Sequence, residues 1–161
     1  MWVIDVTNDT GVIENAWEWY SILPDWLRSK SLAKYKKKDD FIKHFKNDCL
    51  FYGQDGSEGS VLVVAEITAL KTYEGHLFCP RFADPHLVSA VIRYGTNWVF
   101  KYTDCDRVIN VVRTRHWGLK KIVENAGFVK TGYSLWDSAA ATGKVFEGKL
   151  YIANRGDYEK K

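Results

Sequence analysis

The first third of the chain carries hydrophobic residues at alternate positions and then at helical spacing. The alternation in WVIDVT (2–7) predicts a strand. The next three residues, Asn-Asp-Thr, are favoured helix N-caps, and apolar residues then recur at helical spacing as far as Leu23. Pro24 ends this helix, and the spacing predicts a second helical region over 26–46. The sequence therefore predicts one strand followed by two helices.

Beyond residue 48 the hydrophobic period changes to two, which is typical of strands. Two such runs at 49–54 and 61–70, joined by the turn DGSEGS, predict a β-hairpin, and 72–80 predicts a third strand. Asp84-Pro85 is the clearest helix start in the chain. Asp is a favoured N-cap, and Pro is favoured at the first helical position because it has no N–H to leave unpaired.

The last third of the chain alternates between the two periods. VINVVRT predicts a strand, and the short amphipathic helix that follows ends at Gly127, where a left-handed C-cap is needed. Strands are predicted at 128–137 and 145–154, and the tail 155–161 is expected to be frayed. The order is β-α-α-β-β-β-α-β-α-β-β, which predicts a single α/β domain over 1–154 with a mixed sheet flanked by helices.

Composition narrows the class of protein. The chain has 161 residues, of which 46% are hydrophobic and 27% charged, a mixture typical of globular proteins. The three cysteines form no CxxC and show no zinc-type spacing with the histidines, so no metal site is expected and a reducing cytoplasm is the expected compartment. The N-terminus does not resemble a signal peptide, and no apolar run is long enough for a membrane span.

Positive charge gathers in one segment, 28–46, which holds eight Lys or Arg and two Asp. A solvated helix face accounts for such a segment, and a phosphate-binding surface is the alternative. Three of the lysines, Lys36, Lys37 and Lys38, are consecutive and spread over about 200° of a helix. This spread favours the solvated face over a nucleic-acid reader.

The stretch RVINVVRTRHWGLKKIVENAGFVKTGY contains a strand, a short helix, the pair Gly127-Phe128 and then Gly132. In this stretch, and in the order of its elements over nearly its whole length, the chain resembles the GNAT superfamily of acyl-CoA-dependent N-acyltransferases. The resemblance implies that the strand 72–80 and the strand after the central helix splay apart. It also implies that pantetheine and the thioester carbonyl are held by free backbone N–H groups in the gap.

The resemblance places the acyl-CoA on specific residues, although its phosphate loop departs from the family pattern. Phe78 and Cys79 would lie along the pantetheine, and Arg81 matches the leading position of a loop that wraps the pyrophosphate. Asp84 and His86 stand where the family has glycines. An Asp N-cap accepts the helix N–H groups that phosphate would otherwise bind, and its charge repels phosphate. His86, when protonated, is the remaining candidate phosphate ligand of this loop, and an exposed surface histidine is the alternative interpretation.

The resemblance also bears on the groups that transfer protons. His116 occupies the position of the family's frequent Asn and is assigned to cofactor binding, and Val123 occupies the position of its frequent Tyr acid. Tyr102 and Tyr133 are the alternatives for that acid. The candidate catalytic bases are His76 and Glu74, which share one face of a strand. Glu66 lies on the preceding strand, and a histidine bonded within the sheet is the alternative interpretation of His76.

Three functions follow from these patterns. The first is an acyl-CoA-dependent N-acyltransferase with an atypical pyrophosphate loop, using acetyl-CoA or another acyl-CoA. The second is a protein that keeps the fold without the cofactor and binds a partner or serves a structural role, loosely similar to small GNAT-like phage proteins, including virion components. The third is nucleic-acid binding through the lysine-rich segment. No motif identifies the acceptor amine, a protein partner or the oligomeric state.

Overall fold

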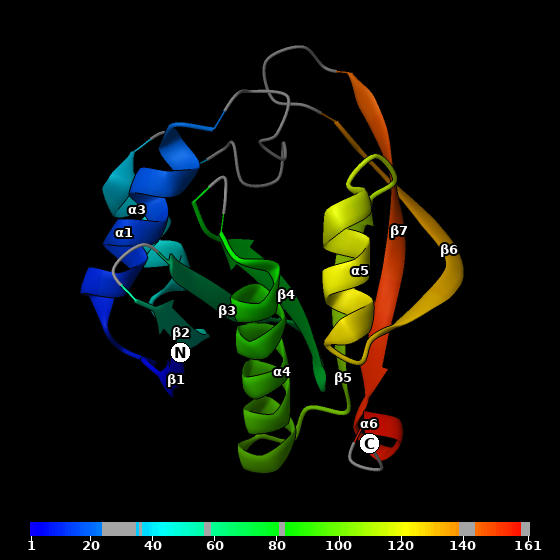
Figure 1. The fold of residues 1–161 in the computed structure, drawn as a ribbon. Helices are drawn as coiled ribbons and strands as arrows, with labels where there is room; N and C mark the ends of the chain where they lie inside the picture. The colour runs from blue at the N-terminus through cyan, green and yellow to red at the C-terminus, as the bar shows by residue number, and fades with distance from the viewer. Residues whose placement is uncertain (24–34, 36, 57–58, 81–82, 139–143, 159–161) are drawn as a thin grey trace.

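The chain folds into one mixed sheet with helices on both faces (Figure 1). The computed structural model describes residues 1–161 except 24–34, 36, 57–58, 81–82, 139–143 and 159–161. The strands are β1 (Trp2–Asp5), β2 (Cys49–Asp55), β3 (Gly59–Ala69), β4 (Thr72–Phe78), β5 (Arg107–Arg113), β6 (Val129–Ser138) and β7 (Val145–Asn154). The helices are α1 (Thr10–Ser21), α3 (Lys38–Phe45), α4 (Pro85–Tyr102), α5 (Trp117–Asn125) and α6 (Arg155–Tyr158).

The predicted order of elements is confirmed up to β7. The helical region predicted over 26–46 is described only in part, because much of it lies outside the described residues, and its described helix is α3. The seven strands follow the order β1-β2-β3-β4-β5-β7-β6. All neighbouring strands pair antiparallel except β4 and β5, which are parallel. The chain passes through α4 between these two strands, as a parallel connection requires.

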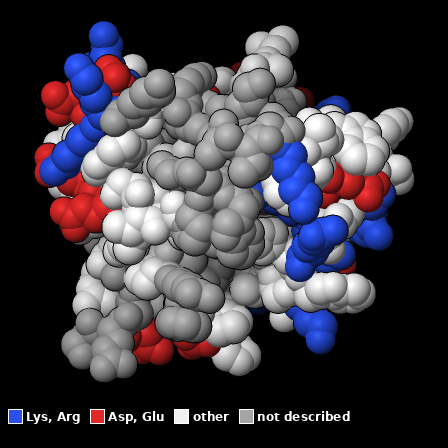
Figure 2. All heavy atoms as spheres, turned by 90° about the horizontal axis from the view of Figure 1, so that it is seen from above, with Lys and Arg blue, Asp and Glu red and all other residues white. Residues whose placement is uncertain are grey.

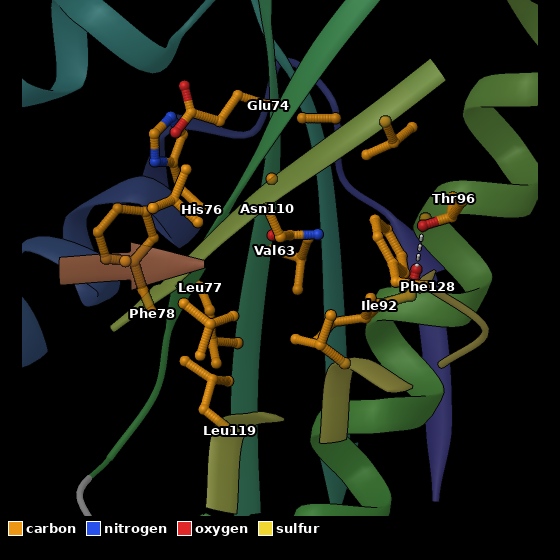
Figure 3. A pocket seen from close by; sticks show the side chains of 18 of the residues that line it. Val63, Glu74, His76, Leu77, Phe78, Ile92, Thr96, Asn110, Leu119 and Phe128 are labelled. Carbon is orange, nitrogen blue, oxygen red and sulfur yellow. Dashed lines mark hydrogen bonds between the residues drawn. The ribbon is translucent and has the colours of Figure 1, made fainter. Parts of the chain in front are cut away.

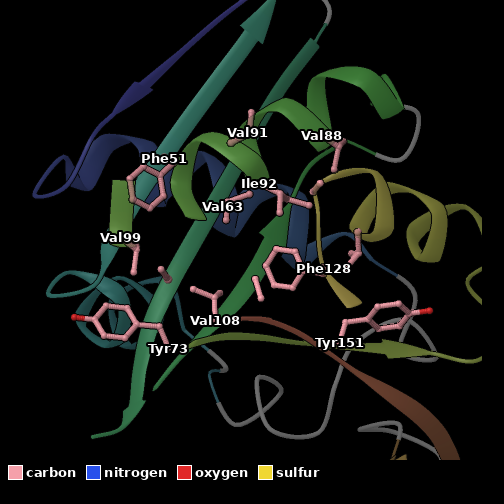
Figure 4. Close-up of a cluster of buried hydrophobic side chains, with 14 of the residues drawn as sticks. Phe51, Val63, Tyr73, Val88, Val91, Ile92, Val99, Val108, Phe128 and Tyr151 are labelled. Carbon is pink, nitrogen blue, oxygen red and sulfur yellow. The ribbon is translucent and has the colours of Figure 1, made fainter. Parts of the chain in front are cut away.

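Each face of the sheet has its own hydrophobic core because side chains alternate along the strands. In β3, Val61, Val63 and Ala65 point toward α4 and α5, where Phe100, Phe128 and Tyr151 complete the larger core. Figure 4 shows this cluster, with Val63 and Val108 from the sheet facing Val91, Ile92 and Val99. The intervening residues face α1 and α3 and form the second core, whose fully enclosed members are Ile13, Ala16, Phe41, Phe45, Leu50, Leu62 and Val64.

Among the described residues, basic side chains do not form a continuous surface on the face seen from above. Figure 2 shows Lys and Arg in separate groups there, with acidic side chains beside some of them. Lys38 of the lysine-rich segment pairs with Glu14 of α1 across 2.6 Å. Lys36 and all of the segment 28–34 lie outside the described residues. Binding of nucleic acid by this segment therefore stays a prediction.

The chain end docks onto the fold through α6. The prediction of a frayed tail is wrong for Arg155–Tyr158. Tyr158 is buried between Phe100 and Phe128, and its hydroxyl donates to the Ala126 carbonyl at 2.6 Å. The Arg155 guanidinium donates to the carbonyls of Thr103 and Cys105. A buried ring and a guanidinium that donates three hydrogen bonds, at the end of the last strand, outweigh the usual tendency of a terminus to fray.

The helix α5 ends as the sequence predicts, on a left-handed glycine. Gly127 has a φ of 101°, and its N–H donates to the Glu124 carbonyl at 2.9 Å while Phe128 N–H donates to Val123 at 3.2 Å. These two bonds make a Schellman motif. A Cβ at Gly127 would lie 2.7 Å from the Tyr158 ring. Both the backbone angle and the docked α6 therefore require glycine here.

We expect Gly127→Ala to lower the free energy of unfolding by about 1 to 2 kcal/mol, because alanine at positive φ is strained and its methyl group meets Tyr158. Gly118→Ala is the control, because Gly118 lies within α5 and an added Cβ meets no atom within 4 Å. That change should stabilise by about 0.5 to 1 kcal/mol. Urea denaturation measures both, and equal effects of the two substitutions would contradict the C-cap assignment.

Candidate functional site

The parallel strands β4 and β5 part soon after they meet. Their register contains three pairs, from Thr72↔Arg107 to Glu74↔Ile109, although both strands continue for four more residues. The next residues are Gly75 and Asn110. The Asn110 carboxamide oxygen lies 2.7 Å from the point where a Cβ of Gly75 would be. The polar side chain of Asn110 therefore occupies the apex of the gap, and only glycine on β4 leaves room for it.

A cavity of about 480 Å³ opens at this gap. Its lining includes Gly75, Leu77 and Asn110, which face α4 and α5, and also Glu74 and His76, which face the opposite side of the sheet. Figure 3 shows Glu74 and His76 at one end, Asn110 near the middle, and Thr96 and Phe128 toward α4. The cavity thus passes through the sheet between the parted strands and reaches both faces.

His76 belongs to a chain of three ionisable side chains on the α1 and α3 face. Its Nε2 lies 2.6 Å from Oε2 of Glu66, and the other carboxylate oxygen of Glu66 lies 3.0 Å from Nε2 of His44. The exposed fractions are 15% for His76, 23% for Glu66 and 26% for His44, so the group is shielded yet reachable from solvent. With Nε2 bonded to Glu66, Nδ1 is the ring nitrogen of His76 that can accept a proton from a substrate.

Asp48, at the end of α3, adds a second carboxylate to this group. Burial, followed by the negative charge of Glu66, raises the pKa of Asp48 to about 6, while the backbone N–H of Ile67 and the charge of His76 act the other way. The side chain is buried, with 8% of its surface exposed. Asp48 therefore adds negative charge near His76 above about pH 6 and is neutral below it.

The N-terminus of α4 is closed by its own cap. Asp84 Oδ1 accepts the His86 N–H at 3.0 Å, and Val88 N–H donates to the Asp84 carbonyl at 3.0 Å. The cap that the sequence predicts is thus confirmed. A phosphate at this helix end would have to displace or lie beside a carboxylate.

Solved structures with similar folds are numerous, although a scan against models of known protein families and a search of curated proteins find no match. A mutant of spermidine N-acetyltransferase SpeG from Vibrio cholerae superposes with a TM-score of 0.68 at 17% identity, covering 98% of this chain and 97% of the other. The ribosomal-protein-S5-alanine acetyltransferase of Vibrio fischeri gives 0.69 at 15% identity, over 97% and 93%.

The ribosomal L7/L12 α-N-protein acetyltransferase RimL, solved with coenzyme A, gives a TM-score of 0.68 at 11% identity, over 94% of this chain and 93% of the other. These likenesses extend over almost the entire length of every chain compared. The chain has the GNAT acetyltransferase fold. At these identities the likeness establishes the fold of this GNAT-fold protein, while its substrate and activity are separate questions.

The structure brings some of the predicted site residues together and separates others. Glu74, His76, Phe78 and His116 all line the cavity. The Phe78 ring, however, packs among the aromatic residues of the α1 and α3 core rather than along the gap. Burial, followed by the charge of Arg113, lowers the pKa of His116, so its imidazole is neutral at physiological pH.

Two other predicted positions, Cys79 and His86, do not line this cavity, and a third lies outside the described residues. Cys79 packs at the edge of the larger core, and burial raises the pKa of its thiol to about 11, which makes it inert as a nucleophile. His86 is exposed and lies over a separate hollow with Met1, Arg93 and Tyr94, so it faces away from the gap. Arg81 lies outside the described residues. The roles assigned to these residues stay predictions.

Sequence reasoning missed the residue at the apex and two residues around His76. Asn110 sits inside a run of strand residues and carries no motif. His44 pairs with Glu66, and the charge of Glu66 acts on Asp48, only because α3 packs against this part of the sheet. Tyr102 and Tyr133, the two tyrosines that the sequence offers as the acid, are both exposed. Neither is among the described residues that line the cavity.

Two general findings concern the part of the chain that the structure describes. It contains no group of three or more His, Cys, Asp or Glu side chains arranged to hold a metal ion. No helix in that part combines the length and the apolar character needed to cross a membrane.

We expect Asp48→Asn to stabilise the protein more at pH 8 than at pH 4. The folded state holds the Asp48 proton more tightly than the unfolded chain does. The stability that the protonated Asp48 contributes to the folded state is therefore fully present below its ordinary pKa of 3.8. It is lost as the pH rises through the folded-state pKa of about 6. The gain in unfolding free energy should be larger at pH 8 by about 2 kcal/mol.

Chemical denaturation at the two pH values measures this difference. The control is Asp5→Asn, since Asp5 is exposed and its carboxylate also accepts a backbone N–H, that of Thr7 at 2.9 Å. The control should show no such pH dependence. A stability difference for Asp48→Asn that stays constant between pH 4 and pH 8 would contradict the assignment.

Proposed function

We propose that this protein is an N-acyltransferase that transfers an acyl group from a pantetheine thioester such as acetyl-CoA to an amine. The observation that carries the proposal is the cavity that crosses the sheet between β4 and β5 and has His76 on one of its walls. A donor entering from the α4 and α5 face and an amine entering from the opposite face would meet at this gap. The structural neighbours named above are N-acetyltransferases, and one was solved with coenzyme A.

The chain supplies a base at the meeting point. The amine nitrogen bonds to the carbonyl carbon of the thioester, the C–S bond breaks, and the amine gives up one proton. Nδ1 of His76 accepts that proton, while Glu66 holds Nε2–H and stabilises the imidazolium that forms. The departing thiolate takes its proton from water, because the position of the family's frequent tyrosine is Val123, which lines the cavity.

The donor's pyrophosphate has a poor site at α4. Asp84 already accepts a helix N–H, and its charge opposes phosphate. Binding of coenzyme A is therefore expected to be weak and to rely on the contacts of the pantetheine and the acyl group with the cavity. The same cap supports a second candidate function, in which the protein keeps this fold without the cofactor and binds a partner.

We expect His76→Gln to reduce acyl transfer about 100-fold or more while leaving donor affinity unchanged, because only the proton acceptor is removed. Thiol release from acetyl-CoA with a panel of primary amines measures the rate, and calorimetry measures donor binding. His86→Gln is the matched control, because His86 lies over the separate hollow. At saturating acetyl-CoA its rate should equal that of the wild type, because His86 does not reach the reacting atoms. If no amine releases thiol and no thioester binds, the second candidate replaces the enzyme.

We expect Asp84→Asn to tighten coenzyme A binding, because asparagine caps a helix as well as aspartate does and carries no charge. The predicted gain is roughly two- to tenfold in Kd, measured by calorimetry at low salt. Asp9→Asn makes the same change at the N-cap of α1, where Asp9 accepts the Gly11 N–H at 2.9 Å, and should leave the Kd unchanged. An equal response of the two variants would show that phosphate does not approach α4.

A further inference from the structure

One arm of the cavity extends beneath α4, away from the gap between the strands. Its walls are Val63 and Ala65 of β3, Val108 of β5, and Thr96 and Val99 of α4, and the arm also reaches Phe51 of β2 and Phe128. Figure 3 shows Val63, Ile92, Thr96 and Phe128 on one side of Asn110, with Glu74 and His76 on the other. Asn110 therefore lies at the junction between this arm and the His76 end.

The arm is distinct from the gap itself. Val108 is paired with Tyr73, where β4 and β5 are still bonded to one another, while Ala65 and Val63 of β3 lie opposite Gly75 and Leu77, at and beyond the apex. The space here lies between the sheet and α4, on the face that carries the larger core. A pantetheine chain running between the parted strands would pass the mouth of the arm without filling it.

The walls of the arm are apolar. Phe51, Val63, Ala65, Val99 and Val108 are each at most 7% exposed. Thr96 is the one polar side chain among the wall residues of β3, β5 and α4 named above. Its hydroxyl donates to the Ile92 carbonyl one turn earlier at 2.8 Å, which satisfies it within the helix. A polar ligand would find a single hydroxyl in these walls, whose proton is already used within the helix, whereas a hydrocarbon chain would lose only its contact with water.

We infer that this arm holds the acyl chain of the donor, and that the preferred donor is a pantetheine thioester of a medium-length, unbranched fatty acid rather than of acetate. A dry apolar cavity of about 150 Å³ accommodates a six-carbon ring. About a third of the present 480 Å³ would therefore hold a chain of roughly six carbons. The thioester carbonyl would lie at the apex beside Asn110, with its chain under α4 and its carbonyl carbon open toward His76.

This inference rests on the proposed function and gives it a donor class. It also accounts for a donor site with a poor phosphate end, because a buried chain contributes affinity that does not depend on the N-terminus of α4. Each buried methylene group lowers Kd by up to about fourfold. A chain of six or more carbons would then offset a weak pyrophosphate contact.

The test is a calorimetric titration with thioesters whose acyl chains have two, four, six and eight carbons, each attached to coenzyme A in one series and to pantetheine in the other. The expected result is a Kd that falls about two- to fourfold per methylene group in both series. The pantetheine series lacks the nucleotide, so it reports on the cavity alone. Coenzyme A and pantetheine without an acyl group give the reference affinities.

Ala65→Leu is designed to fill the arm from β3, and it should abolish the dependence of Kd on chain length. Thr96→Leu fills the arm from α4 and serves the same purpose if the first variant does not fold. Ala90→Leu is the control, because Ala90 lines the separate hollow on another side of α4. It should keep the wild-type dependence.

The outcomes separate the two proposals. If the thioesters bind but Kd stays the same from two to eight carbons, the acyl-chain inference is overturned and the N-acyltransferase proposal stands. If the dependence persists in Ala65→Leu and in Thr96→Leu, the chain lies elsewhere and the inference is again wrong. If no thioester of either series binds at any chain length, the proposed function fails and the inference fails with it.

Discussion

The feature on which the rest of this structure depends is the short parallel contact between β4 and β5. Three residue pairs hold the strands together, and beyond them each strand keeps only its outer neighbour. The strands can part because β3 supports β4 along its other edge and β7 supports β5, so neither becomes an isolated edge. Gly75 and Asn110 fit against each other at the point of divergence, and a larger residue at Gly75 would meet the Asn110 side chain.

The same divergence explains why ionisable groups collect at one place. Where two strands part, side chains near the gap border open space rather than packed neighbours, and polar groups can remain hydrated. Glu66 and His76 face each other across β3 and β4, and α3 brings His44 and Asp48 to the same carboxylate. An ionised Asp48 beside Glu66 costs stability, which is the usual price of keeping charge poised in a partly buried site.

The sequence predicted the order of elements well because the hydrophobic period switches cleanly and the helix ends carry local signals. Asp84 and Gly127 are such signals, since a cap and a positive φ are decided by a few neighbouring residues. The docking of α6 was not predictable in this way. Tyr158 is held by Phe100 and Phe128, which are far away in sequence, and nothing near Tyr158 indicates that contact.

The contacts of the candidate site also depend on long-range packing, which the sequence alone does not predict. His76 and Glu74 could be placed on one strand face from their spacing, because alternation fixes the face. The pairing of His76 with Glu66 depends on the register of β3 with β4, in which Val64 lies opposite His76 and Glu66 opposite Glu74. A shift of one residue would have turned Glu66 to the other face. The partner of His76 thus follows from the hairpin register rather than from any motif.

The N-terminus of α4 and the arm of the cavity beneath α4 bear on different parts of the proposed donor, the phosphates and the acyl chain. In the proposed function, phosphate and the acyl chain would use different parts of α4, its N-terminus and its buried side. Asp84 would weaken phosphate binding without affecting the chain, because the cap involves His86 while the arm lies two turns and more further along, at Thr96 and Val99. A helix can therefore lose a glycine-rich phosphate loop and still position a thioester, provided that its buried side leaves room for the chain. Under the donor inference, the protein would select its donor by the acyl group more than by the nucleotide.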